Sequence, residues 1–186
     1  IAGLDENNQA FTVGYQVTDS DGDPVNGSLS ISVNDDTPTV SENAVAQLDD
    51  DALAGGNPGG IGDVNPDTSN TSGTLSHSFG ADGAGSISWL TTGAPAGFAY
   101  VLSGSDLLVN QGAVTVMTLT LDALTGAYSV TQNAPIAHIA GLDENDQAFT
   151  VGYQVTDSDG DPVDGSLSIS VNDDTPTVSR NAIAQL

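Results

Sequence analysis

The residues with the clearest chemical potential are aspartates spaced two apart, which occur twice: Asp19, Asp21 and Asp23, then Asp157, Asp159 and Asp161. Alternate side chains of an extended segment face the same side, so three such carboxylates can converge on one cation. Calcium fits this arrangement because it takes roughly six to eight oxygen ligands and tolerates irregular geometry. The spacing copies the opening of an EF-hand loop, but Pro24 and Ser30 stand where that loop needs glycine and glutamate. The alternative is an aspartate-rich hairpin turn that binds no ion.

A long internal repeat organises the chain. Residues 1–48 recur as residues 139–186, offset by 138 positions, and the copies differ only at Asn8/Asp146, Asn26/Asp164, Glu42/Arg180 and Val45/Ile183. A period of this length suits a whole domain better than one coil of a solenoid. We therefore expect tandem repeats of 138 residues, with residues 1–40 ending one repeat, 41–178 forming a complete repeat and 179–186 beginning the next.

The elements that must position these aspartates are β-strands, because the apolar period is two. Phe11–Val17 and Leu29–Val33 alternate apolar residues with threonine, serine, glycine or glutamine, as half-buried strands do. Further strands are expected at Leu75–Phe79, Ile87–Leu90, Phe98–Leu102, Leu107–Val109, Val114–Leu121 and Tyr128–Val130. Parity breaks at Val116-Met117, which predicts a bulge, and Asp122–Gly126 suits a hairpin turn. Seven or eight short strands with such turns predict an all-β, antiparallel immunoglobulin-like sandwich.

Chain direction predicts where the acidic segments meet. The final hairpin of each repeat ends in a linker, Asp35-Asp36-Thr37-Pro38 or its copy, where proline limits flexibility. The hairpin loop must then lie at the N-terminal pole of its sandwich, facing the preceding linker. The segment before the hairpin should lie at the opposite, C-terminal pole. The additional ligands expected at such a junction are Asp35, Asp36, Asp173 and Asp174 in the linkers, and Asp5, Glu6, Asp143 and Glu144 before the hairpins.

Other acidic segments are weaker candidates. Asp82 and the triplet Asp49–Asp51 could join a site at the N-terminal pole, or could be ordinary exposed turn residues. Gly59-Gly60-Ile61-Gly62-Asp63 resembles part of a calcium-binding β-roll repeat, but it occurs only once and imperfectly. It lies in a long Gly- and Pro-rich loop, Asp49–Asp67, within the repeat.

Composition disfavours several functions. The chain carries 25 acidic residues against one basic residue, a net charge of −24, which disfavours nucleic-acid and anionic-membrane partners. It has no cysteine, so a secreted form must be stabilised by its core, by metal or by neighbouring repeats. His77 and His138 are the only histidines, and no nucleophile elbow, P-loop or histidine metal cluster occurs. We expect no enzyme.

A family resemblance rests on the closing motifs of the repeat. Val17-Thr18-Asp19-Ser20-Asp21-Gly22-Asp23 followed by Ser32-Val33-Asn34-Asp35-Asp36-Thr37-Pro38 resembles the extender repeats of bacterial RTX adhesins exported by type I secretion. It is also similar to the cadherin-like repeats of large biofilm proteins. The resemblance implies Ca²⁺ bound by the matching aspartates Asp19, Asp21, Asp23, Asp35, Asp36 and their copies. It further implies an extracellular location on the bacterial cell surface, where calcium stiffens the junctions and the array projects a distal adhesive region.

The expected function is therefore a structural extender for adhesion or biofilm formation, with adjacent repeats and calcium ions as partners and no nucleic acid or membrane insertion. One alternative is a module that itself binds a polysaccharide or another surface. A second is a subunit that self-associates into an extracellular filament, which the partial repeat at residues 1–40 keeps open.

Overall fold

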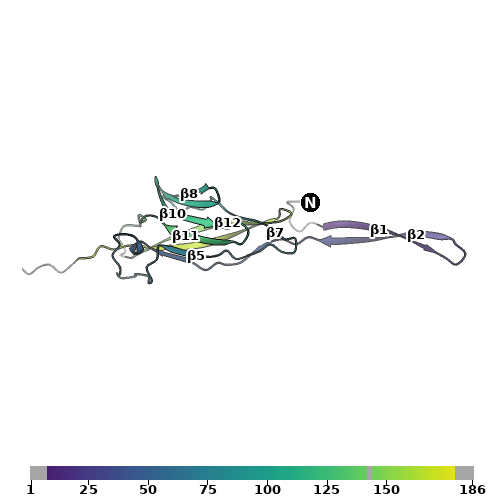
Figure 1. The fold of residues 1–186 in the computed structure, drawn as a ribbon, viewed down its shortest axis with the longest axis horizontal. Coiled ribbons are helices and arrows are strands. Elements are labelled where there is room, and N and C mark those ends of the chain that lie inside the picture. Colours follow the sequence, from purple (N-terminus) through teal and green to yellow (C-terminus); the bar gives the residue numbers. More distant parts are fainter. Residues whose placement is uncertain (1–7, 142–143, 179–186) are drawn as a thin grey trace, which may run out of the picture.

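The structure is a computed structural model that describes residues 8–141 and 144–178. Its strands form two main sheets, one in the order β5-β11-β10-β9-β8 and one in the order β4-β13-β12-β7 (Figure 1). Paired strands are antiparallel except β13 and β4, which run parallel. The strands are β1 (Asn8–Thr18), β2 (Pro24–Asn34), β3 (Thr39–Val40), β4 (Ala46–Asp49), β5 (Asn70–Thr74), β6 (His77–Ser78), β7 (Ala84–Trp89), β8 (Phe98–Ser103), β9 (Asp106–Gln111), β10 (Val114–Leu121), β11 (Ala127–Gln132), β12 (Asp146–Asp157) and β13 (Pro162–Asn172). The predicted all-β sandwich is confirmed.

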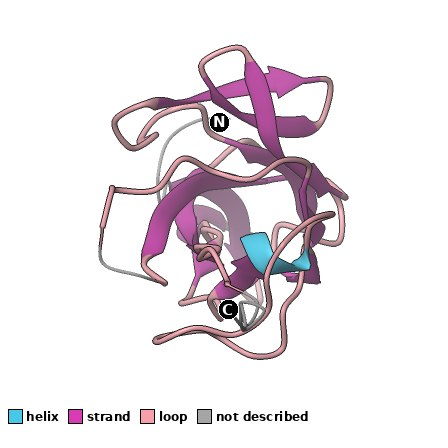
Figure 2. Cartoon of the chain, turned by 90° about the vertical axis from the view of Figure 1, so that its left-hand side faces the viewer, coloured by secondary structure: helices cyan, strands magenta, loops and turns pink. Residues whose placement is uncertain are grey.

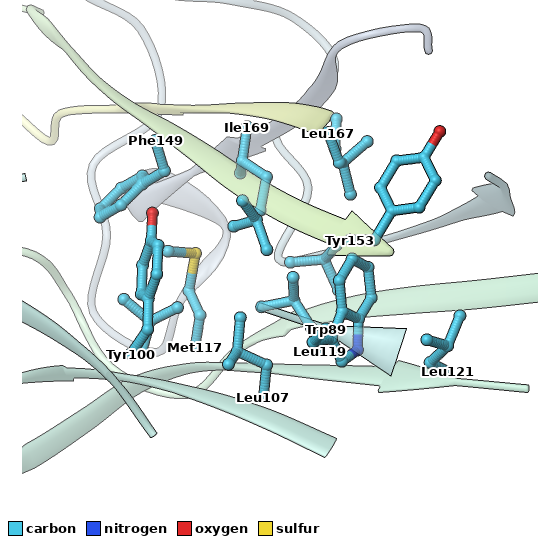
Figure 3. Close-up of a cluster of buried hydrophobic side chains, with 14 of the residues drawn as sticks. Trp89, Tyr100, Leu107, Met117, Leu119, Leu121, Phe149, Tyr153, Leu167 and Ile169 are labelled. Carbon is cyan, nitrogen blue, oxygen red and sulfur yellow. The ribbon is translucent and has the colours of Figure 1, made fainter. Parts of the chain in front are cut away.

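The two sheets enclose one hydrophobic core (Figure 3). Alternate residues of β12 point inward, so Phe149, Val151 and Tyr153 are buried while Thr150 between them is exposed. Leu107, Val109 and Leu119 supply the opposite face from β9 and β10. Burying one such side chain stabilises the fold by about 1.5–3 kcal/mol. Period-two alternation thus becomes a core on one face of each strand and a hydroxyl-rich surface on the other.

The hairpin of β1 and β2 stands apart from the sandwich as a two-stranded sheet of its own (Figure 1). Its sequence differs from that of β12 and β13 only at Asn8/Asp146 and Asn26/Asp164, and its register is the same: Phe11 pairs with Ile31 as Phe149 pairs with Ile169. The burial differs completely, because Phe11 is 49 % exposed and Phe149 only 2 %. The same hairpin is therefore present once with its complementary strands and once without them, in keeping with the expectation that residues 1–40 cannot make a sandwich alone.

Several local expectations are confirmed and some strands were missed. The register between β9 and β10 shifts between Thr115 and Met117, where the bulge is predicted. Asp122 closes the β10–β11 turn by accepting hydrogen bonds from the backbone N–H groups of Leu124 and Thr125. The missed strands are short or polar: β5 (Asn70–Thr74) pairs with β11 only along one edge, and its sequence has no large apolar residue to signal a strand.

The two ends of the sandwich have distinct compositions. At the C-terminal pole, where β13 ends, the loop after β4 begins with a 3₁₀ turn, η1 (Asp50–Ala52), which lies at the near end in Figure 2. At the N-terminal pole the β12–β13 turn meets residues 35–36. η1 is the only helical element in the described part of the chain. No helix there is long and apolar enough to cross a membrane.

Candidate metal centres

The β12–β13 turn is folded around one carboxylate. Asp157 Oδ1 accepts hydrogen bonds from the backbone N–H of Gly160 at 3.0 Å and of Asp161 at 2.8 Å. Gly160 has φ of 107°, a conformation that a side chain would strain. The other oxygen, Asp157 Oδ2, is buried and accepts no hydrogen bond from the described residues. The turn thus uses one oxygen of Asp157 for its own geometry and leaves the second facing its neighbours.

The preceding linker docks on this turn, as chain direction predicts. One carboxylate oxygen each from Asp35, Asp159 and Asp161 lies within 4.8 Å of the other two. Next to them, Asp36 Oδ2 accepts a hydrogen bond from Ala81 N at 2.7 Å, and Asp36 N donates one to Asp82 Oδ2 at 3.0 Å. We call Asp35, Asp157, Asp159 and Asp161 the N-terminal-pole cluster. Asp36 and Asp82 hold the linker beside it.

The cluster is electrostatically uneven. The neighbouring Asp157 carboxyl group is the main cause that raises the pKa of Asp159 to about 6, and burial and the charges of Asp35 and Asp161 act in the same direction. Burial raises the pKa of Asp157, but hydrogen bonds, first of all from Asp161 N, outweigh it, and the net pKa lies below its usual value. Crowded carboxylates of this kind are relieved either by a proton or by a cation.

The first copy of the turn shows what the linker and the sandwich add. The carboxylates of Asp19, Asp21 and Asp23 also lie within 4.8 Å of one another, and Asp19 makes the same two backbone hydrogen bonds as Asp157. All three residues are exposed. The loop alone therefore gathers its aspartates, and the burial of Asp157 and Asp161 comes from the surrounding repeat.

A second cluster lies at the C-terminal pole. Carboxylate oxygens of Asp49, Asp51 and Asp63 lie within 4.8 Å of one another. The expectation that the triplet Asp49–Asp51 joins the N-terminal pole is wrong. β4 pairs in parallel with β13, with Leu48 opposite Val171 and Asp49 opposite Asn172, so the triplet is carried to the opposite end. We call Asp49, Asp51, Asp63 and the nearby Glu144 the C-terminal-pole cluster.

The linker that leaves this pole is also held. Asp174 Oδ1 accepts hydrogen bonds from Asn57 N at 3.2 Å and Asn57 Nδ2 at 3.1 Å. Thr175 Oγ1 donates to Glu144 Oε1 at 2.6 Å. Glu144 therefore lies beside the linker, where the sequence puts it. The other residues expected before the hairpins, Asp5, Glu6 and Asp143, lie outside the described residues.

A third group at the same pole contains a histidine. His138 Nε2 lies 3.5 Å from Asp50 Oδ2 and 3.8 Å from Asp173 Oδ1. Burial lowers the pKa of His138, but Asp50 and Asp173 outweigh it and the net pKa is raised. Asp50 also accepts hydrogen bonds from Gln132 Nε2 and Ile136 N. These contacts describe a satisfied, buried acid that orients a histidine.

The chemistry of both pole clusters favours a hard cation. Their donors are all carboxylate oxygens, which suit calcium, magnesium or manganese rather than softer metals. Two oxygens on opposite sides of a calcium ion lie about 4.6–5.2 Å apart, because each Ca–O distance is about 2.3–2.6 Å. The oxygens of Asp35, Asp159 and Asp161, and those of Asp49, Asp51 and Asp63, all lie within 4.8 Å of one another and so are close enough to share one ion. The acidic clusters could thus hold a metal ion.

The C-terminal-pole cluster is the feature that sequence reasoning missed as a site. Its strongest signal was the single β-roll-like motif ending at Asp63, but nothing local linked that motif to Asp49 and Asp51. In comparisons with known proteins, residues 35–170 match a family described as "Domain of unknown function (DUF5801)". No curated protein and no solved structure matches the chain.

Proposed function

The chain belongs to the DUF5801 family, and we propose that it is a structural extender module of a large bacterial surface adhesin. In this proposal, calcium bound at each junction between repeats stiffens the array and holds a distal adhesive region away from the cell. The observation that carries the proposal is the junction itself: Asp35 of the linker meets Asp159 and Asp161 of the following sandwich.

The linker is present twice, and each copy shows its contact with one of the two neighbouring sandwiches. At residues 35–36 it contacts the sandwich that follows, and at residues 173–174 it contacts the sandwich that precedes. The corresponding carboxylates can serve both neighbours at once, because Asp36 bonds Ala81 through Oδ2 while Asp174 makes its shorter bonds to Asn57 through Oδ1. In an array, every linker would be hydrogen-bonded to both the preceding and the following sandwich, and these bonds would limit the angles between adjacent repeats.

Calcium would strengthen the attachment of the linker to the β12–β13 turn. Asp35, Asp159 and Asp161 would hold the ion together with the unpartnered oxygen of Asp157. Without it, these carboxylates repel one another and push the linker off the turn. Extracellular calcium modules bind with dissociation constants of about 10⁻⁴–10⁻³ M. At free calcium about 100 times that constant, binding stabilises the bound state by about 2.7 kcal/mol.

The adhesin proposal is supported by the near-identical tandem copies and by the closing motifs. The alternative of a sugar-binding module has less support. Trp89 and Tyr100, the aromatic residues that could form a sugar platform, are both buried in the core.

Small-angle X-ray scattering of the 186-residue chain tests the stiffening. With calcium we expect a longer maximum dimension and a narrower distance distribution than with chelator, because the hairpin β1–β2 becomes fixed relative to the sandwich. Asp159→Asn should abolish most of that difference. Asp164→Asn is the matched control, since it removes an exposed carboxylate that the first copy already lacks at Asn26. An unchanged length on adding calcium to the unsubstituted chain would refute the proposal.

A further inference from the structure

We propose that the C-terminal-pole cluster is a second, buried calcium site inside the repeat, in which Asp49, Asp51, Asp63 and Glu144 hold the ion. The ligands come from the end of β4, from η1 and the following loop, and from the segment before β12. All four belong to one complete repeat, so this site is distinct from the cluster of Asp35, Asp159 and Asp161, and the outgoing linker touches it through the hydrogen bond from Thr175 to Glu144.

Three of the four carboxylates are buried. Asp49 is 1 % exposed, Asp51 5 % and Glu144 7 %. Both carboxylate oxygens of Asp51 are buried and accept no hydrogen bond from an N–H or hydroxyl group of the described residues, and the Asp174 carboxyl group that faces them is itself acidic. A buried charge without a compensating partner is strongly destabilising. A buried carboxylate with both oxygens unpartnered calls for a ligand that the protein does not supply.

The pattern of partnered and unpartnered oxygens is the second argument. Asp49 Oδ1 accepts from Asp51 N at 2.9 Å, and Asp49 Oδ2 is left over. Asp63 Oδ2 accepts from Asn65 Nδ2 at 2.7 Å, and Asp63 Oδ1 is left over. Glu144 Oε1 accepts from Thr175 Oγ1, and Glu144 Oε2 is left over. In these three carboxylates one oxygen is fixed by a protein donor while the other is buried without a hydrogen-bond partner among the described residues, as in metal sites whose ligands are oriented by outer hydrogen bonds.

The glycine-rich loop is built to close over these groups. Gly60 lies against Glu144 so closely that a side-chain carbon there would overlap Glu144 Oε1. The start of the loop is anchored by the hydrogen bond from Asp49 N to Thr68 O at 2.9 Å. The glycine that the β-roll-like motif supplies thus permits a close approach to Glu144.

Charge identifies the class of ligand. The chain has one basic residue, Arg180, which lies outside the described residues, and His138 is turned toward Asp50 and Asp173. No protein cation of the described residues therefore neutralises the C-terminal-pole cluster. An all-carboxylate cage suits calcium, whereas magnesium usually keeps several waters and takes only one or two carboxylates.

Calcium binding to the full chain, measured by calorimetry, tests the site. We expect Asp51→Asn and Asp63→Asn each to lose one bound ion per chain relative to the unsubstituted protein, and Asp164→Asn to lose none. Asp159→Asn should instead lose the junction ion and keep this one, so the two proposals can fail separately. Unchanged stoichiometry in both Asp51→Asn and Asp63→Asn would overturn the inference.

Two further readouts separate a ligand from a structural carboxylate. Without calcium, Asp51→Asn should raise the melting temperature because it removes a buried charge, and with calcium it should show a smaller calcium-induced rise. A lower melting temperature without calcium would contradict the site.

Calcium should also slow elastase cleavage between residues 52 and 64 in the unsubstituted chain and in Asp159→Asn, but not in Asp63→Asn. Equal protection in Asp63→Asn would contradict it as well.

Discussion

At the scale of single residues, the chain contains its own controls. Phe149 packs edge to face on Phe98, with ring centroids 4.9 Å apart, and is 2 % exposed. Its copy, Phe11, has the same neighbours in sequence and is 49 % exposed. Any effect of sequence context alone is therefore shared by the two positions, and a difference between them reports tertiary packing.

Substituting these two phenylalanines should give very different results. We expect Phe149→Ala to lower the free energy of unfolding by about 3–5 kcal/mol, the usual loss for a buried phenylalanine. Phe11→Ala should change it by less than about 0.5 kcal/mol, as exposed substitutions do. Urea unfolding followed by Trp89 fluorescence measures both, since Trp89 lies in the core. Equal losses would mean that β1–β2 is packed in solution.

The same scale shows which ligands can be read from a sequence. The grouping of Asp157, Asp159 and Asp161 can be predicted from the sequence because all three lie in one turn of five residues. Their copies, Asp19, Asp21 and Asp23, come together in the hairpin that no sandwich surrounds. Asp49 and Asp51 are separated from Glu144 by more than ninety positions. They meet only because β4 pairs with β13, and no local pattern specifies that parallel pairing. The first site follows from spacing and the second from tertiary structure.

At the scale of elements, alternation predicted most strands and their hairpins. It missed β4, whose four residues are too few to show a clear alternation, and elements whose residues are mostly polar. β5 lies at a sheet edge and presents asparagine, serine and threonine, so its hydrogen bonds to β11 carry no apolar signature. η1 is likewise set by Asp49, whose side chain accepts a hydrogen bond from Asp51 N at the start of the turn.

The end of β4 and η1 should make the calcium-free chain sensitive to pH. Burial raises the pKa of Asp49 to about 6, and the charges of Asp67, Asp63 and Glu144 act in the same direction. Burial likewise raises the pKa of Asp51 to about 7, together with the neighbouring carboxyl groups of Asp174, Asp49 and Glu144. Raised values mean that the folded state binds more protons than the unfolded state. Stability must therefore fall as pH rises from about 4 to 7.

Urea unfolding of calcium-stripped protein at pH 5 and pH 8 measures this dependence. We expect lower stability at pH 8, and the raised pKa values of His138 and Asp159 act in the same direction. Asp51→Asn should flatten the profile, and saturating calcium should restore stability at pH 8. A calcium-free chain that is more stable at pH 8 than at pH 5 would show that these carboxylates are not crowded in solution.

At the scale of the whole molecule, charge and repetition act together. A chain with a net charge of −24 and one basic residue cannot neutralise its buried acids from within. It concentrates them at the two poles of each sandwich, where the linkers pass. A divalent ion at each pole would remove repulsion inside the repeat and between repeats at the same time, so that stability and stiffness would rise together with calcium.

The repeat also implies that β1–β2 is one half of a sandwich whose other strands have the sequence of residues 41–138. A longer chain, with a copy of residues 41–138 placed directly before Ile1, should bury Phe11, Tyr15 and Leu29 as Phe149, Tyr153 and Leu167 are buried. In that chain, with calcium, Phe11→Ala should become as costly as Phe149→Ala, about 3–5 kcal/mol by urea unfolding. Phe11 and Phe149 would then occupy equivalent positions in two different sandwiches. If Phe11→Ala stayed neutral in the longer chain, the near-identical sequences would not form equivalent sandwiches, and the 138-residue period would not be the structural unit.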